Sequence, residues 1–232
     1  MDPKKYLTFW KETEEIGGGD MMKIYDISML IHDGMMIYKN REENKPQLEL
    51  VKSFDTDGIN ESSIKMNLHS GTHIDAKFHM NKFGETSEKF DLSRLVTKCK
   101  VIDLTQLKFK ISREDLSKFE INKDDFILLK TKNSFSEVFL FDYIYLDESG
   151  AEYLKELSIS GVGIDALGIE RNQPNHITHK KLMDKDIIIL EGLVLKDVPA
   201  GEYFLCALPL KIEGADGAPA RVILIDDFRL HL

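Results

Sequence analysis

The segment NLHSGTHIDAKFHM, residues 67–80, constrains the fold of this chain more than any other part of the sequence. It holds four residues with metal-binding or acid–base side chains: His69, His73, Asp75 and His79. In one straight strand, at about 3.3 Å per residue, His69 and Asp75 would lie about 20 Å apart. A helix is disfavoured because Gly71 stands between two hydroxyl residues and there is no apolar stripe. Neither regular structure brings these side chains together.

A bend in this segment would bring them together. We expect a tight turn at Ser70 and Gly71 after a strand, followed by a second extended piece that returns His73 and Asp75 towards His69. Imidazole and carboxylate groups are the ligands that suit zinc, manganese and iron at neutral pH. The spacing therefore favours a metal site over a chance cluster of polar loop residues.

A carboxylate in an apolar strand is a candidate for the second half of this site. Glu191 follows IIIL and precedes GLVL, and burying an unpaired charge costs several kcal/mol. It therefore needs a positive partner, and a salt bridge to one of the 31 Lys and Arg residues is as good an explanation as a bound metal. His179 lies near the start of a short predicted helix that leads into this strand and could return to Glu191.

Short β-rich runs dominate the chain and predict about ten strands. They cover residues 23–31, 47–55, 62–70, 98–105, 125–132, 143–146, 162–165, 186–192, 203–210 and 220–226. Helical patterns are fewer and cover residues 112–120, 147–158 and 175–185. In the first of these helices, Ser112 is a plausible N-cap with Glu114 in the first turn. The chain is therefore predicted to be a mixed α and β protein.

The first twenty residues differ from the rest. Tyr6, Phe9 and Trp10 share one helical face, and a Gly17–Gly19 hinge follows. We expect residues 1–20 to be a helical extension, which could serve as a lid, a dimer arm or a cloning remnant. With neither an internal repeat nor a later linker, residues 21–232 are predicted to form a single domain.

Charge and composition exclude several classes of partner. A net charge of −9 argues against nucleic acid, which leaves a small molecule as the expected partner. No apolar run reaches the roughly 20 residues that span a bilayer, and the N-terminal residues lack a secretory signal. Cys99 and Cys206 are predicted to be free thiols, so a cytoplasmic location fits. Sequence motifs for dinucleotide, nucleoside triphosphate and serine-hydrolase sites are absent.

The sequence HSGTHIDAKFH resembles the H-x-G-T-H-x-D-x-P-x-H signature of the cyclase-like family of metal-dependent hydrolases, which includes bacterial kynurenine formamidase and isatin hydrolase. The resemblance covers nearly the whole chain after Met22. Four further segments match in order: KIYDISMLIHDGMMIY, GVGIDALGIE, HKKLMDKDIIILEGL and ALPLKIEGADGAPARVI. One departure is Lys77, which stands where the signature has proline and places a cation beside the site.

This resemblance implies a role for each matching residue. The metal ligands would be His69, His73, Asp75, His179 and Glu191. Asp75 would reach two ions. Zinc is the metal expected, and manganese is the alternative. His79 would remain unligated as the catalytic proton donor and acceptor, and Tyr38 would be a substrate-binding side chain.

The resemblance also implies a reaction and a fold. We expect a metal-activated hydroxide to cleave an amide C–N bond, with an N-formylkynurenine-like aryl formamide as the leading substrate. A cyclic amide, imide or lactone is the runner-up, and a non-catalytic metal-binding protein is the alternative of another class. The implied fold is a swivelling β/β/α domain, an α+β fold with a barrel-like sheet and a few short helices. The family implies a homodimer or homotetramer.

Overall fold

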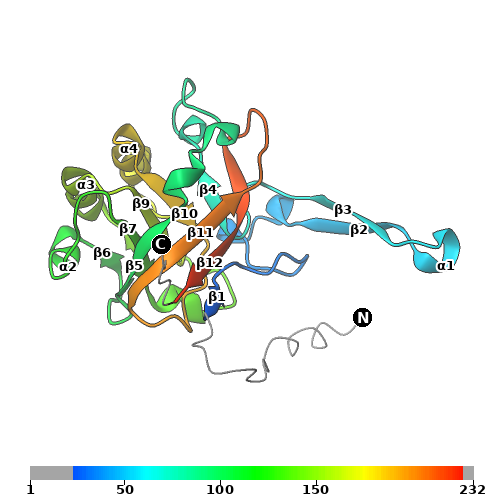
Figure 1. The fold of residues 1–232 in the computed structure, drawn as a ribbon, viewed down its shortest axis with the longest axis horizontal. Coiled ribbons are helices and arrows are strands. Elements are labelled where there is room, and N and C mark those ends of the chain that lie inside the picture. The colour runs from blue at the N-terminus through cyan, green and yellow to red at the C-terminus, as the bar shows by residue number, and fades with distance from the viewer. Residues whose placement is uncertain (1–22, 227–232) are drawn as a thin grey trace, which may run out of the picture.

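A computed structural model describes residues 23–226 of the chain. The helical extension predicted over residues 1–20 lies outside the described residues. Figure 1 shows a twisted sheet with three helices against one side and a long hairpin projecting from the other.

Twelve strands are present in the described residues. They are β1 (Ile24–Asp26), β2 (Gln47–Lys52), β3 (Glu61–Lys65), β4 (His73–Asp75), β5 (Val96–Asp103), β6 (Lys110–Ile111), β7 (Phe126–Lys130), β8 (Tyr145–Leu146), β9 (Gly161–Ile164), β10 (Ile188–Glu191), β11 (Gly201–Pro209) and β12 (Gly217–Ile225). Each of the ten predicted β-rich runs overlaps one of them. The other two are β4, which was expected only as an extended piece, and the short β6.

Helices are short and few over the same range. The α-helices are α1 (Phe54–Asp57), α2 (Arg113–Leu116), α3 (Glu148–Leu157) and α4 (Ile177–Asp184). Seven 3₁₀ helices cover Tyr38–Asn40, Glu42–Asn44, Lys77–His79, Ser87–Lys89, Leu92–Arg94, Lys132–Phe135 and Pro174–His176. Three of the α-helices were predicted. The strand predicted over residues 47–55 was wrong at its end, since residues 54–57 form α1.

Seven strands close into a barrel-like sheet. Its order is β12-β11-β5-β7-β9-β10-β4, with β4 pairing back onto β12 and β1 added outside β12. The four strands β5, β7, β9 and β10 run parallel, and β4 is antiparallel to both of its neighbours. The predicted mixed α+β fold with a barrel-like sheet and a few short helices is confirmed.

The central strand β7 shows how this sheet is held. Its sequence FILLK is buried along its whole length, as expected of a parallel strand covered on both faces. Ile127 and Leu129 pack into one core cluster beside the helices. Phe126 and Leu128 pack into a second cluster on the opposite face of the sheet. The two cores hold the strand ends, from which the site residues emerge, in a defined register.

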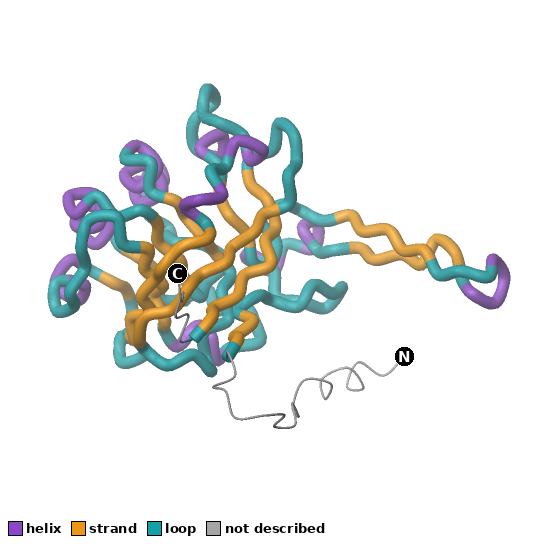
Figure 2. Tube along the Cα trace, in the orientation of Figure 1, coloured by secondary structure: helices purple, strands orange, loops and turns teal. Residues whose placement is uncertain are grey.

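The helix ends follow the local sequence. Ser112 caps α2 in a capping box with Asp115, as predicted for its N-cap. Asp147 caps α3 by accepting a hydrogen bond from the backbone N–H of Gly150. Helices α2, α3 and α4 lie together against the sheet (Figures 1 and 2). Both cysteines are free, Cys99 buried and Cys206 partly buried, as predicted.

Candidate metal centre

The predicted bend in the histidine segment is present. Gly71 has φ +73, a left-handed conformation that favours glycine. The backbone N–H of His69 donates to the side chain of Asn67 at 2.8 Å, which tightens the turn before Gly71. As a result, the Nδ1 atom of His69 lies 2.9 Å from Oδ1 of Asp75, although a straight strand would hold these residues far apart.

Sheet register brings the two halves of the site together. His73 on β4 is the register partner of Glu191 on β10. On its other edge β4 pairs with β12, where Gly217 stands opposite Asp75. Helix α4 carries His179 and leads directly into β10. Residues more than a hundred positions apart therefore face one another because β4 closes the barrel.

Two carboxylates and two histidines form a compact buried cluster at this closure. The Nε2 atom of His73 lies 3.4 Å from an oxygen of Asp75 and 3.4 Å from an oxygen of Glu191. The Nε2 atom of His179 lies 3.5 Å from the second oxygen of Asp75. It also lies 3.3 Å from the second oxygen of Glu191. Each carboxylate thus presents one oxygen to each histidine.

These separations fit a shared cation. Ligand atoms bound about 2.1 Å from one tetrahedral zinc ion lie about 3.4 Å from one another, whereas a charged hydrogen bond is usually shorter than 3 Å. Within residues 23–226, Nε2 of His73 and Oδ2 of Asp75 are buried without a hydrogen-bond partner. Buried polar atoms normally have one. The donor set therefore fits a divalent ion.

The rings of both histidines are oriented by their other nitrogen. Nδ1 of His73 donates to the backbone carbonyl of Gly71 at 2.9 Å, and Nδ1 of His179 donates to Glu170 at 2.8 Å. With each proton held on Nδ1, the lone pair of Nε2 faces the cluster. This carboxylate or carbonyl support is the usual outer arrangement around metal-binding histidines.

Glu191 has no Lys or Arg partner in the described part of the chain. Its charge faces His73 and His179, and its Oε1 atom accepts a hydrogen bond from the backbone N–H of Ile169 at 2.6 Å. Of the two explanations left open by the sequence, a salt bridge to a surface cation is therefore wrong for these residues.

The electrostatics of the cluster are strongly coupled. Burial lowers the pKa of His73, but Asp75 and Glu191 outweigh burial and raise it to about 10. Burial raises the pKa of Glu191, as does Asp75, yet His179 and His73 outweigh both and lower it to about 2. The carboxylates therefore demand positive charge, and a divalent cation meets that demand while leaving the histidines neutral.

His79 lies at the edge of this cluster. Its ring is 4.1 Å from that of His69 and 6.0 Å from that of His179, measured between ring centres. Its Nδ1 atom lies 3.5 Å from Oδ2 of Asp216, and its side chain is 29% exposed. Burial lowers the pKa of His79, and His69 and His179 add to this effect against the pull of Asp75. A neutral imidazole with access to solvent is suited to accept a proton.

Tyr38 lies in an aromatic group beside the cluster. Its ring packs edge-on against Phe139 at 5.4 Å, and Phe139 in turn packs against Tyr143 at 5.7 Å. Gly168 lies close to the ring of Tyr38, and the next residue, Ile169, donates to Glu191. The aromatic group therefore contacts Gly168, one residue before the backbone donor to the candidate ligand Glu191.

Lys77 is placed beside the site but pairs away from it. Its Nζ atom lies 2.7 Å from Asp186 and 3.7 Å from Glu85. Asp186 also binds Arg94 at 2.8 Å. In the described residues the cation that replaces the signature proline therefore links the loop after β4 to the loop after α4.

The sequence reasoning missed two acidic residues of the site. Glu170 is buried between His179 and His176, and Asp216 contacts both His69 at 3.0 Å and His79. Glu170 had the same signal as Glu191, a carboxylate at the end of an apolar run. Asp216 stands in a loop-like GADGAP stretch, so only the pairing of β12 with β4 places it here.

Comparisons with known proteins identify the family of this chain. A family model described as "Putative cyclase" matches residues 25–171. The chain belongs to the cyclase family. One curated relative in it is the kynurenine formamidase of Sphingopyxis alaskensis, 30% identical over 88% of this chain and 98% of that protein.

Two solved structures share the fold of this chain. One, titled a potential metal-dependent hydrolase with cyclase activity, is 48% identical with a TM-score of 0.84, covering 89% of this chain and 98% of the other. Isatin hydrolase A from Labrenzia aggregata has a TM-score of 0.77 at 23% identity, over 88% and 93% of the two chains, and shows the shared fold alone. With the formamidase relatives, these findings identify a metal-dependent hydrolase.

Proposed function

We propose that this hydrolase cleaves the amide C–N bond of an aryl formamide, with N-formylkynurenine as the leading substrate. Such an activity would belong to tryptophan degradation. The formamidase relatives along nearly the whole chain support the substrate class. The observation that carries the chemistry is the pair of buried, unpartnered atoms, Nε2 of His73 and Oδ2 of Asp75, among the described residues.

We propose zinc as the bound metal and manganese as the alternative, because nitrogen and carboxylate donors suit both. The proposed ligands are His69, His73, Asp75, His179 and Glu191. When bound, the ion supplies Lewis-acid chemistry that polarises the substrate carbonyl and lowers the pKa of water. Both ring nitrogens of His69 contact carboxylates, Nδ1 that of Asp75 and Nε2 that of Asp216.

The protein's own groups move the proton. His79 accepts a proton as water attacks the formyl carbon and returns it to the leaving nitrogen, so that formate and the free amine are formed. Asp216 faces the Nδ1 atom of His79. Its carboxylate favours a proton on Nδ1 and leaves Nε2 available to accept the proton from water. Burial lowers the pKa of His79, which favours the neutral ring that can act as the base.

The aromatic group supports an aryl substrate. Tyr38, Phe139 and Tyr143 pack edge to face beside Gly168, and the next residue, Ile169, donates its backbone N–H to Glu191. Aromatic side chains favour flat aromatic ligands through edge-to-face and offset contacts. We propose that Tyr38 contacts the substrate ring, as the family resemblance implies.

The direct test is a panel of N-formylkynurenine, isatin and a simple lactone, assayed with zinc-loaded and manganese-loaded protein. We expect formate release from the formamide in proportion to bound metal, and its loss in His79→Ala at equal metal content. Turnover of only the cyclic substrates would replace the formamidase proposal with the runner-up. A protein that holds metal and turns over none of the three would support a binding role.

We also propose a cytoplasmic enzyme, which the two free thiols support. Within residues 23–226, no helix has both the length and the apolar character needed to cross a membrane.

A further inference from the structure

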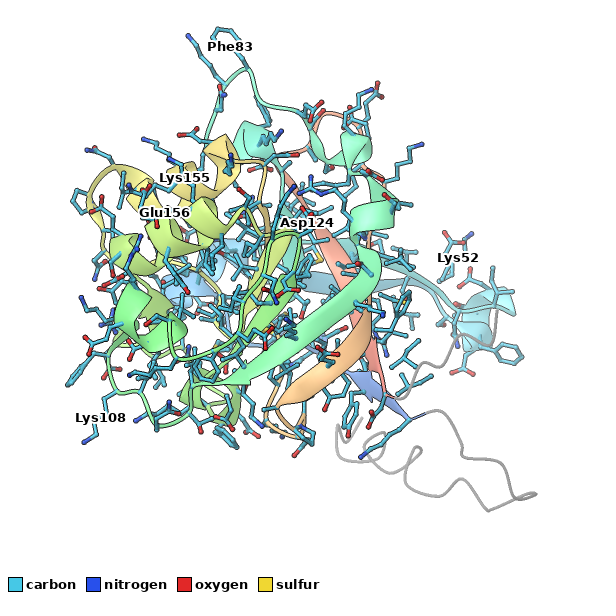
Figure 3. All side chains as sticks on the ribbon, turned by 60° about the vertical axis from the view of Figure 1, so that its left-hand side comes forward. Lys52, Phe83, Lys108, Asp124, Lys155 and Glu156 are labelled. Carbon is cyan, nitrogen blue, oxygen red and sulfur yellow. The ribbon has the colours of Figure 1, made fainter. Side chains whose placement is uncertain are left out.

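The short helix that carries His79 is followed by an exposed loop. This helix, Lys77–His79, is closed by a hydrogen bond at 3.0 Å from the backbone N–H of Phe78 to the carbonyl of Glu85, at the far end of the loop. Figure 3 shows Phe83 at the outer end of this loop, where its side chain is 84% exposed. A loop in solvent opens easily, whereas proton transfer needs a closely fixed ring. Contacts at the start of the helix therefore matter for the position of His79.

Lys77, the first residue of this helix, makes such a contact. Its Nζ atom lies 2.7 Å from Oδ1 of Asp186, whereas Glu85 in its own loop is 3.7 Å away. Asp186 stands in the turn between α4 and β10, the elements that carry His179 and Glu191. The ion pair therefore joins the helix of the proposed acid–base residue to the segment between two proposed metal ligands.

Asp186 occupies a backbone position where glycine is usual. Its φ is +61, in the left-handed region, and its N–H donates to the carbonyl of Met183 at 3.0 Å. The next N–H, that of Ile187, donates to the carbonyl of Leu182, also at 3.0 Å. These two bonds form the Schellman motif that ends many helices, in which glycine most often takes the left-handed position. An aspartate at this position adds a carboxylate that the turn itself does not need.

Arg94 holds this carboxylate from the other side. Its Nη1 atom lies 2.8 Å from Oδ2 of Asp186. Its Nη2 atom donates to the backbone carbonyl of Ser160 at 3.0 Å and to that of Asp186. The carbonyl of Ser160 also accepts from the N–H of Ile188, at the point where β9 and β10 begin to pair. A guanidinium bound at several points has a fixed orientation, so Asp186 is a fixed anchor for Lys77.

We propose that Lys77, Asp186 and Arg94 are positioning residues for His79, because they fix the start of its helix to the sheet. The proposal rests on the role of His79 in the proposed function. The three side chains line one cavity of about 360 Å³ together with Asp75, so the network lies beside the metal centre. Because the charge of Lys77 faces Asp186, the network acts on the placement of the His79 ring and not on the substrate.

A proline at position 77 would fix the same helix in a different way. Proline locks its own φ at about −65° and is well tolerated as the first residue of a helix. Lys77 is the first residue of its helix and stands where the family signature has proline. In this chain an ion pair therefore takes the place of a covalent restraint. Unlike a proline ring, a partly exposed ion pair is weakened by salt.

The test is the steady-state kinetics of the metal-loaded protein with N-formylkynurenine, or with the cyclic substrate if only that is turned over. Lys77→Met and Asp186→Asn should each lower kcat by about 10-fold and change KM by less than about 2-fold, since a misplaced catalytic group costs turnover more than binding. The double variant should be no slower than the slower single variant, because both changes break one contact. Lys82→Gln is the matched control, since Lys82 lies in the same loop and contacts the ring of Phe83. Metal content should be equal in all four.

Lys77→Pro is the rescue variant. Its kcat should stay within about 2-fold of the wild type, because proline restrains the same residue. Raising the salt from about 0.1 to 1 M shortens the Debye length from about 10 to about 3 Å. This change should lower the kcat of the wild type by about 3-fold and leave that of Lys77→Pro unchanged.

Hydrogen exchange gives a measurement that does not depend on turnover. Amides of residues 78–85 should exchange faster in Lys77→Met than in the wild type, and at the wild-type rate in Lys77→Pro and Lys82→Gln. A wild-type kcat in Lys77→Met would overturn the proposal, as would a loss confined to KM, unchanged amide exchange, or a Lys77→Pro variant as slow as Lys77→Met. Wild-type turnover in His79→Ala would instead overturn the role of His79 in the proposed function, and the exchange rates would still decide whether the network fixes the helix.

Discussion

The metal centre buries charged side chains, whereas the arm, the hairpin of β2 and β3, exposes apolar ones. At the centre, two carboxylates and two histidines lie almost fully buried, with Asp75 and His73 at 1% and 0% side-chain exposure. On the arm, leucine, isoleucine and phenylalanine side chains are half exposed or more. Each arrangement is costly for an isolated chain. At the centre this cost fits the proposed cation, whereas the apolar side chains of the hairpin are left uncovered by the rest of the described chain.

The largest effect is expected when Asp75, the carboxylate that faces three histidines, is replaced. Asp75→Asn should abolish tight metal binding and lower turnover by about 10³-fold or more, since the proposed metal site depends on this residue. Metal analysis together with the formamide assay measures both effects. Glu49→Gln, an equal charge loss on the arm, should leave both unchanged. Tight metal binding by Asp75→Asn would remove Asp75 from the ligand set.

His79→Ala separates proton transfer from metal binding. We expect turnover to fall by about 10²- to 10⁴-fold while the metal content stays at the wild-type level, because general acid–base groups contribute on this scale. Asp216→Asn should have a smaller effect on turnover, since it only positions the ring. If His79→Ala releases the metal instead, His79 is a ligand.

Glu170→Gln tests the support behind His179. The amide still fills the space but no longer demands the Nδ1 proton, so metal affinity should weaken by about 10- to 100-fold. Competition with a chelator of known affinity measures this. Glu152→Gln is a control on the surface of α3, where the carboxylate pairs with Lys181. Equal chelator competition in both variants would show that Glu170 has no such role.

The smallest expected effect is the pH dependence of stability in chelator-treated protein. His73 has its pKa raised from 6.5 to about 10, so its contribution is complete below pH 6.5 and is lost as the pH rises towards 10. Glu191 has its pKa lowered from 4.5 to about 2, so its contribution is complete above pH 4.5 and is lost as the pH falls towards 2. Both contributions are complete between pH 4.5 and pH 6.5.

Added zinc should change this profile in one direction. Because zinc needs neutral histidines, the rise in melting temperature that it causes should grow from pH 6.5 upward, where the metal-free protein loses stability. Thermal scans with and without zinc measure the difference. A zinc effect that shrinks with rising pH would contradict a histidine-bound ion.

Much of the fold was predictable because its signals are local. β-rich runs marked the strands, and Ser112 marked the start of α2. The end of the run over residues 47–55 was wrong because Gly58, with φ +72, terminates a short helix at the tip of the arm. Nor could the pattern of Leu48, Leu50 and Ile64 show that the rest of the chain leaves that face uncovered.

The sequence alone determined which chemistry is available, since residue type defines the donor atoms and Gly71 permits the turn they need. Only the tertiary structure decided which donors meet. The pairing of β4 with both β10 and β12 brings His73 to Glu191 and Asp216 to His79. The physical reason is that register between distant strands depends on packing over the whole barrel, whereas a turn or a donor atom depends on a few neighbouring residues.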